Sequence, residues 1–245
     1  MGTRTCYNAS MSNSPGAKVR REEEIAFLAM EQVLGVDIRL ADANGGDKMP
    51  DGSWENRDGR TRCIVEVTSP PADRLMAEWA KAKREGRSQA ESGAVPLRLN
   101  ELADVCAELL ASDWAVENIE KLKAQPADER HLFLFGRGHD VGHYFYRLSD
   151  SCEVGSTEPV ADLVLPDGIS DVWFRGRARR KSGQLLGSTE VWLARYGTAL
   201  GWQRYVVEIE EQDLPSPAAG IADDPVPAPM RHTKDRTAVG GTADS

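Results

Sequence analysis

The hydrophobic positions of the chain follow two periods, which predict helices and strands in a definite order. Apolar residues such as Ile25, Leu28 and Val33 recur at helical spacing, and Gly35 is a natural end for that helix. Short apolar or alternating runs rich in Val, Ile and aromatic residues predict strands. The pattern predicts helices over 21–35, 69–86, 99–112 and 113–125, and strands over 36–41, 52–56, 61–68, 131–136, 143–149, 171–178, 189–196 and 202–210.

This order of elements predicts a mixed α/β fold, in which helices pack on both sides of a central mixed β-sheet. An Asp-Gly turn at 58–59 predicts that the strands over 52–56 and 61–68 form a hairpin. The aromatic-rich strands expected in the C-terminal part would extend the sheet beyond this core.

The two ends of the chain lack a hydrophobic period. Residues 1–17 are small and polar, and residues 214–245 are rich in Pro, Ala, Gly and Asp. Such segments offer too little apolar surface to offset the entropy lost on ordering. We therefore expect a single folded domain over 18–213 between two disordered tails.

Composition narrows the possible classes of function. The chain has 245 residues, of which 40% are hydrophobic and 28% are charged, as in soluble globular proteins. It contains no apolar run of about 18 residues, so we expect no membrane span. Its four cysteines form no C-x-x-C pair, which favours a reduced, cytoplasmic setting. A net charge of −9 disfavours a passive nucleic-acid binder, but it leaves room for an enzyme with a local basic patch.

Two carboxylates stand close together in the predicted hairpin. Asp51 precedes its first strand, and Glu66 interrupts the apolar run of its second strand. Strand alternation places Glu66 and Thr68 on one face and Val65 and Val67 on the other. If the hairpin pairs in register, Asp51 lies beside Glu66, and the two charges repel unless a cation joins them. Oxygen ligands of this kind suit Mg²⁺ or Mn²⁺. The alternative is a turn sequence at Asp51 and an arginine partner for Glu66.

This stretch resembles the motif of the PD-(D/E)XK nuclease superfamily, which has the restriction-endonuclease-like fold. Pro50-Asp51 is followed, after a hairpin-length gap, by Glu66-Val67-Thr68. The predicted elements from Val19 to Gly136, about half of the chain, are similar in order to the family core of helix, strand, strand, strand, helix and strand. The resemblance implies that Asp51 and Glu66 bind Mg²⁺ or Mn²⁺ and that the protein hydrolyses phosphodiester bonds in DNA or RNA.

The chain departs from the family motif at Thr68, which occupies the place of the motif lysine. That lysine supplies a positive charge for the attacking water and the transition state, and a threonine hydroxyl brings no charge. The resemblance therefore implies that Thr68 belongs to the catalytic group and that a lysine comes from elsewhere. The nearest candidates in sequence are Lys48, Lys81 and Lys83.

The family often carries a further glutamate on its first helix, near the metal. Glu22, Glu24 and Glu31 compete for that role, and Glu24 is the one we select. The alternative for each is a solvated position in the first helix, whose N-terminal turn favours acidic residues through the helix dipole.

Two further clusters contain basic or ligand-type residues. The basic segment from Arg175 to Lys181 could contact the phosphates of a nucleic acid, or could be a solvated hairpin tip. His139 and His143 are four residues apart, but the glycines around them favour a turn without a ligand role over a helical metal site.

Two hypotheses of function follow. In the first, the chain is a metal-dependent nuclease. In the second, it keeps the nuclease fold but has lost the chemistry and acts as a binding module, as the missing lysine and the acidic charge would suggest. The sequence does not reveal the oligomeric state, any preference for DNA or RNA, or the pathway.

Overall fold

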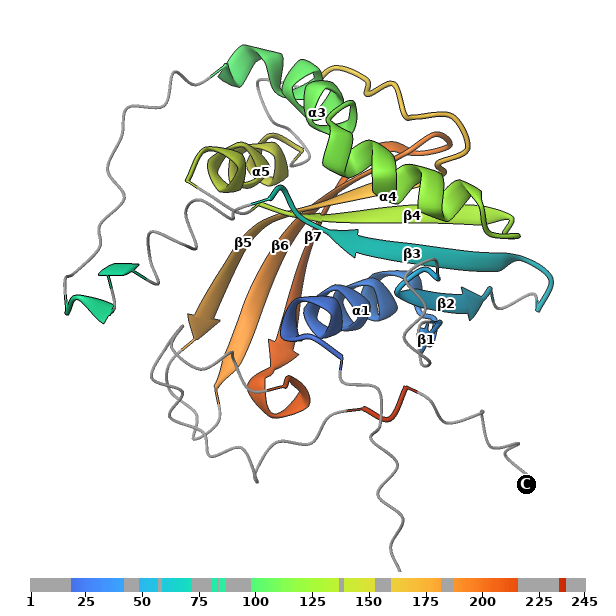
Figure 1. The fold of residues 1–245 in the computed structure, drawn as a ribbon, viewed down its shortest axis with the longest axis horizontal. Coiled ribbons are helices and arrows are strands. Elements are labelled where there is room, and N and C mark those ends of the chain that lie inside the picture. The colour runs from blue at the N-terminus through green and yellow to red at the C-terminus, as the bar shows by residue number, and fades with distance from the viewer. Residues whose placement is uncertain are drawn as a thin grey trace, which may run out of the picture.

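The fold is built on a seven-stranded mixed β-sheet, shown in Figure 1. The structure is a computed structural model. It describes residues 19–41, 49–56, 59–71, 81–82, 84–86, 98–136, 139–152, 160–181, 187–215 and 234–236, with only the backbone described at 99, 139–140 and 177–181.

The strands lie in the sheet in the same order as in the chain. The first three pair antiparallel, the third to the fifth pair parallel, and the last three pair antiparallel. The prediction of a mixed α/β fold is therefore confirmed. The strands are β1 (Arg39–Leu40), β2 (Gly52–Glu55), β3 (Arg62–Thr68), β4 (Glu129–Phe135), β5 (Asp171–Lys181), β6 (Ser188–Gly197) and β7 (Gly201–Glu210).

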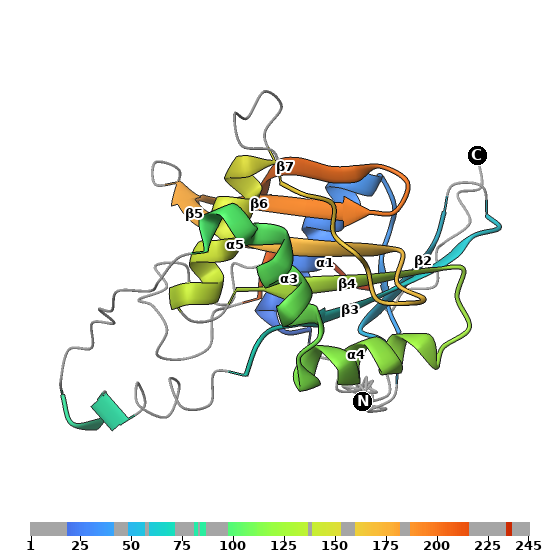
Figure 2. The same ribbon diagram turned by 90° about the horizontal axis from the view of Figure 1, so that it is seen from above.

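Helices cover both faces of the sheet, as Figures 1 and 2 show. α1 (Arg21–Leu34) lies on one face and ends at Gly35, which adopts the left-handed conformation with a φ of 65°. The opposite face carries α3 (Leu102–Leu110), α4 (Asp113–Lys123) and α5 (His139–Ser151). Two short 3₁₀ turns, η1 (Leu99–Glu101) and η2 (Glu211–Asp213), complete the described elements. The helix predicted over 69–86 lies mostly outside the described residues.

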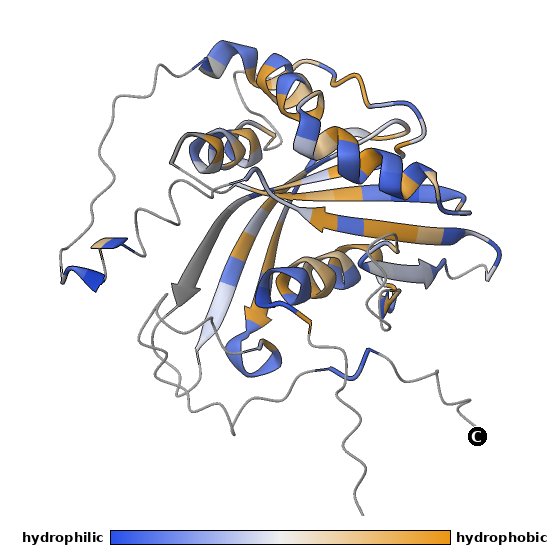
Figure 3. Cartoon of the chain, in the orientation of Figure 1, coloured by the Kyte–Doolittle hydropathy of each residue, from blue (hydrophilic) through white to orange (hydrophobic). Residues whose placement is uncertain are grey.

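Strand alternation divides the buried side chains into two cores, one on each face of the sheet. Figure 3 shows the hydrophobic residues, in orange, along the strands and in the helices beside them. On the α1 face, Val65 and Phe133 pack with Phe27. On the opposite face, Ile64 and Leu132 pack with residues of α3, α4 and α5. Among the described helices, none combines the length and the apolar character that a membrane crossing needs.

The strand predicted over 143–149 and the turn predicted at His139 and His143 are both wrong, because this segment forms α5. Its aromatic residues suggested a strand, but Phe145 and Leu148 are fully buried together against the sheet at helical spacing. Gly136 allows the helix to approach the end of β4, since a Cβ on Gly136 would lie 2.7 Å from the Cα of Gly142. Close packing has therefore overridden local propensity.

Part of the C-terminal segment contacts the folded core. Leu214 is fully buried, and the Arg236 guanidinium is enclosed against α1. Both residues lie in the range predicted to be a disordered tail, while 216–233 and 237–245 lie outside the described residues, as do residues 1–18. The domain boundaries remain a prediction, but the packed part of the chain extends beyond residue 213.

Candidate active site

The register of the β2–β3 hairpin brings Asp51 and Glu66 together at its open end. Gly52 pairs with Val65 across β2 and β3, so the preceding Asp51 comes opposite Glu66. A Cβ on Gly52 would lie 2.8 Å from Ile38 and 2.9 Å from Phe27, so only glycine lets α1 pack this closely beside Asp51. Because Val65 faces α1, strand alternation directs Glu66 towards the other face, where Lys121 of α4 contacts it.

Asp51 is held in place by the neighbouring strand. Its Oδ2 accepts a hydrogen bond from the backbone N–H of Val67 at 2.7 Å. Burial raises the pKa of Asp51 to about 6 despite this bond, and the negative charge of Glu23 acts in the same direction. A partly buried carboxyl group whose ionised form is destabilised in this way favours the arrival of a cation.

Glu66 is buried and has a basic partner on α4. The Nζ atom of Lys121 donates to Glu66 Oε1 at 2.8 Å, and the Glu66 side chain is only 6% exposed. The other oxygen, Oε2, is buried and accepts no hydrogen bond within the described part of the chain. Burial, followed by the charge of Asp51, raises the pKa of Glu66 to about 7, although Lys121 favours the ionised form. The two carboxylates are therefore close enough to interact, and Glu66 Oε2 has no hydrogen-bond partner among the described residues.

Thr68 lies on the same face as Glu66 and also contacts α4. Its Oγ1 accepts a hydrogen bond from Asn118 Nδ2 at 3.1 Å, and the same amide nitrogen donates to the Trp114 carbonyl at 2.6 Å. Asn118 and Lys121 are three residues apart, so one flank of α4 reaches both Thr68 and Glu66. Thr68 is thus part of the site, as a neutral group.

The lysine beside the carboxylates is not one of those selected from the sequence. Lys48 and Lys83 lie outside the described residues, and Lys81 is exposed. Lys121 occupies that position instead, although it follows Glu66 by 55 residues along the chain. Its helix was predicted, but which strand that helix would cover depends on the parallel crossover from β3 to β4, and the sequence carries no signal for that register.

The choice of Glu24 as the first-helix carboxylate is wrong. Glu24 is buried and engages the Arg236 guanidinium with both oxygens, at 2.7 and 2.8 Å. Glu31 also binds Arg236. The α1 residue whose charge acts on Asp51 is Glu23, which was not among the candidates. Glu23 also accepts a hydrogen bond from the Arg20 backbone N–H at the start of the helix.

The basic segment from Arg175 to Lys181 lies on β5, and its tip is only partly described. The Arg175 guanidinium lies over the Phe135 ring, 4.8 Å from its centre, and burial lowers the pKa of Arg175 to about 10. Arg175 therefore packs against the sheet instead of extending into solvent. The side chains of Arg177, Arg179, Arg180 and Lys181 are outside the description, so a phosphate contact by this segment remains a prediction.

Comparisons with protein-family models, with curated proteins and with solved structures each found no match to this chain. The assignment of a function therefore depends on the geometry of the site.

The donor atoms of the site fit a hard divalent cation. Asp51 and Glu66 supply carboxylate oxygens, which Mg²⁺ and Mn²⁺ prefer. The buried Glu66 Oε2 has no other partner among the described residues, which a cation would provide. A cation would also reverse the two raised pKa values, because its charge favours both ionised carboxylates.

Proposed function

We propose that the chain is a metal-dependent nuclease that hydrolyses phosphodiester bonds in DNA or RNA. The observation that carries this proposal is the 2.8 Å contact between Lys121 Nζ and Glu66 Oε1. The strand has Thr68 where the related motif has a lysine, and α4 supplies a lysine at the same carboxylate from outside the motif. The absence of the motif lysine favours the hypothesis of an inactive nuclease fold. Lys121 removes this argument, because it supplies a positive charge at the same carboxylate.

The arrangement of elements also supports the proposal. α1, β1, β2 and β3 precede the crossover helices, and β4 then returns beside β3. This is the order that the resemblance to the PD-(D/E)XK superfamily implies, and the carboxylates lie at the end of β3 in the pair predicted from the motif. We therefore propose a restriction-endonuclease-like core that is extended by β5, β6 and β7.

Each residue has a distinct role in the proposed reaction. Asp51 and Glu66 would hold Mg²⁺ or Mn²⁺, which when bound lowers the pKa of a water molecule and offsets negative charge on a phosphate. Lys121 holds a proton and a positive charge beside the scissile phosphate, where negative charge increases in the transition state. Thr68 accepts from Asn118 and keeps its own O–H available to donate to a water or a phosphate oxygen.

The alternative hypothesis is a binding module without catalytic activity, and it interprets the contact between Lys121 and Glu66 differently. Lys121 and Glu66 would then be a structural ion pair that replaces a metal. A purely structural pair at this depth is expected to satisfy its polar atoms, as buried carboxylates normally do. Glu66 Oε2 does not fit that expectation, since it is buried and has no partner in the described residues. The unsatisfied oxygen favours the nuclease.

The test is a cleavage assay on single- and double-stranded DNA and RNA with Mg²⁺ or Mn²⁺. We expect the wild type to cleave at least one of these substrates, and both Glu66→Gln and Lys121→Met to cleave it about 10²–10³-fold more slowly. Lys123→Met is the matched control, because Lys123 lies on the same helix but pairs with the exposed Glu120, and it should cleave as the wild type does. No cleavage of any substrate by the wild type, or equal losses in Lys121→Met and Lys123→Met, would overturn the proposal.

A further inference from the structure

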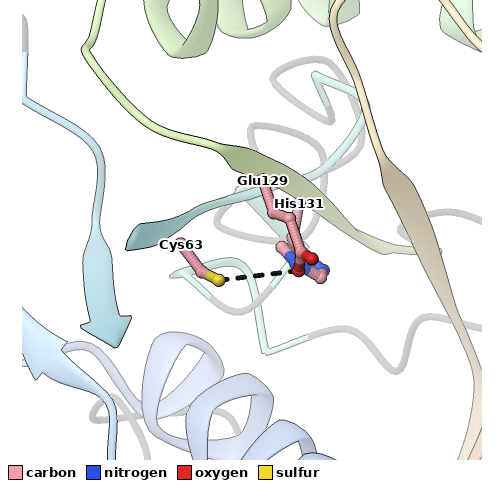
Figure 4. Close-up of side chains that lie close together, drawn as sticks. All are labelled: Cys63, Glu129 and His131. Carbon is pink, nitrogen blue, oxygen red and sulfur yellow. Dashed lines mark hydrogen bonds and ion pairs between the residues drawn. The ribbon is translucent and has the colours of Figure 1, made fainter. Parts of the chain in front are cut away.

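A second group of ligand-type side chains lies on the opposite face of the sheet. Cys63 on β3 pairs with Glu129 on β4, and His131 follows two residues later on the same side. Their potential ligand atoms all lie within 4.8 Å of one another. Figure 4 shows the three side chains converging on the α1 face. Glu66 contacts Lys121 of α4 on the other face, and Asp51 is bound to the Val67 backbone, so the two groups are separate.

The distances within this group suit a small metal ion. Glu129 Oε2 lies 3.5 Å from Cys63 Sγ and 3.5 Å from His131 Nε2. A tetrahedral zinc ion binds sulfur at about 2.3 Å and nitrogen or oxygen at about 2.0–2.2 Å, which places neighbouring ligand atoms about 3.3–3.7 Å apart. Both pairs that involve Glu129 therefore already have this separation, and the Cys63 and His131 atoms lie within 4.8 Å of each other.

The buried imidazole provides an independent reason to expect a ligand. His131 is 1% exposed, and its Nε2 makes no hydrogen bond within the described residues. The Trp54 ring lies 4.9 Å from the imidazole, centre to centre, and helps to bury it. Glu129 Oε2 lies 3.5 Å from this atom, at the limit of a hydrogen bond, so the buried Nε2 is poorly satisfied, and an ion between the thiol, the carboxylate and the imidazole would satisfy it.

We propose that Cys63, Glu129 and His131 bind one zinc-class ion, Zn²⁺ in the cell and Co²⁺ as a probe. Thiolate and imidazole ligands select such ions over Mg²⁺, which prefers oxygen. Three protein ligands leave the fourth position of a tetrahedral ion open to water. Glu129 is the entry side, because its side chain is 42% exposed whereas Cys63 is fully buried.

The surroundings of His131 include a partner that can orient the ring. Binding through Nε2 places the ring proton on Nδ1, which lies 3.7 Å from Asp171 Oδ2. In the structure, His131 Nδ1 accepts a weak hydrogen bond from Trp173 Nε1 at 3.3 Å. In the metal-bound state, Nδ1 would lose this bond and would donate to Asp171 instead. A carboxylate behind a metal-bound histidine fixes its tautomer and makes it a stronger ligand. The Cys63 thiol releases its proton to solvent when the ion binds.

The test is a Co²⁺ titration of the full chain after treatment with a chelator. We expect a thiolate-to-cobalt charge-transfer band that saturates at one equivalent and disappears when Zn²⁺ is added. Cys63→Ser should abolish the band, and Cys152→Ser should retain it. Cys152 is the matched control because it packs in the other core, where burial raises the pKa of its thiol to about 12. Glu66→Gln should also retain the band, which separates this site from the proposed nuclease centre.

Cys63 is fully buried, so Cys63→Ser could lose the band because it misfolds, and a second variant at an exposed ligand is needed. Glu129→Gln changes a half-exposed side chain and should weaken Co²⁺ binding about tenfold or more while the far-ultraviolet circular dichroism is unchanged. Zn²⁺ at about 100 times its dissociation constant should raise the melting temperature of the wild type by about 5–10 °C. Absence of the band in the wild type, or an unchanged band in Cys63→Ser or in folded Glu129→Gln, would overturn the proposal.

Discussion

Two of the buried glutamates, Glu24 and Glu66, both have a basic partner but differ in how many of their oxygens are satisfied. Glu24 on α1 faces Arg236, which engages both of its oxygens and also donates to Glu31 and to the Ile38 carbonyl. Glu66 on β3 faces Lys121, which engages one oxygen and leaves the other without a partner in the described part of the chain. Protein donors therefore bind both carboxylate oxygens of Glu24, but only one carboxylate oxygen of Glu66 has a donor among the described residues.

This difference separates a structural ion pair from a functional one. The guanidinium of Arg236 is planar and carries several donors, so it can bind two carboxylates and a carbonyl at once. Its arrangement leaves no room or need for a ligand. Lys121 is a point charge with one close acceptor, and its carboxylate still lies beside Asp51. Burial alone is therefore a poor guide to function, and the count of satisfied oxygens is a better one.

The largest effect is expected from breaking the satisfied site. Arg236→Met leaves Glu24 buried without a partner, and removing one member of a buried ion pair costs about 3–5 kcal/mol. For a chain of this size the melting temperature should fall by roughly 6–20 °C. Lys234→Met is the control and should lose less, since Lys234 pairs with the exposed Asp37 and with Glu31, which keeps Arg236 as its partner. Equal melting temperatures for Arg236→Met and the wild type would show that the C-terminal segment does not hold α1 in solution.

The same substitution should have opposite signs at the two glutamates. At pH 8 without metal, Glu24→Gln should destabilise the fold because Arg236 loses a charged partner. Glu66→Gln should stabilise it by about 1–3 kcal/mol, since the folded state raises the pKa of Glu66 from 4.5 to about 7 and so disfavours its charge. Chemical denaturation of the two variants measures both values. A loss of stability in Glu66→Gln would mean that the Lys121 pair outweighs the burial of the carboxylate.

The smallest effect is a difference in pH dependence. A carboxyl group whose pKa is raised by folding binds a proton that the unfolded chain has released, so its contribution to stability is lost as pH rises from about 4.5 to about 7. The metal-free wild type should therefore lose a few degrees of melting temperature between pH 5 and pH 8, relative to the Asp51→Asn/Glu66→Gln double variant. Mg²⁺ should restore these degrees at pH 8 and have little effect at pH 5. Parallel pH profiles for the two proteins would contradict the raised pKa values.

Much of the fold could be predicted from local patterns in the sequence. The helical spacing ending at Gly35 predicts α1, and the apolar alternation around Trp173, Trp192 and Trp202 predicts β5, β6 and β7. The Asp-Gly turn and the apolar run around Glu66 predict the hairpin that brings Glu66 beside Asp51. These signals are short-range, because both residues of each contact belong to one element or to one hairpin.

The parts that could not be predicted depend on contacts between distant segments. Lys121 reaches Glu66 only because α4 crosses β3, and Arg236 reaches Glu24 from 212 residues away. Cys63 meets His131 through the parallel register of β3 and β4, which no turn residue specifies. Pairing of this kind is decided by the packing of whole layers, so single-sequence periodicity has no access to it.

The strands lie in the sheet in the same order as in the chain, and this affects how the domain can fold during synthesis on the ribosome. Each strand can pair with the edge left by the strand before it, so the sheet can grow in one direction as the chain emerges. The helix that emerges first, α1, packs against the last strand, β7, and its buried Glu24 meets its partner only at Arg236. A domain assembled from its N-terminus therefore keeps Glu24 without this partner until the segment that carries Arg236 can fold back onto α1. A ribosome stalled before Arg236 would hold a sheet that is already formed beside a helix that is not yet fastened.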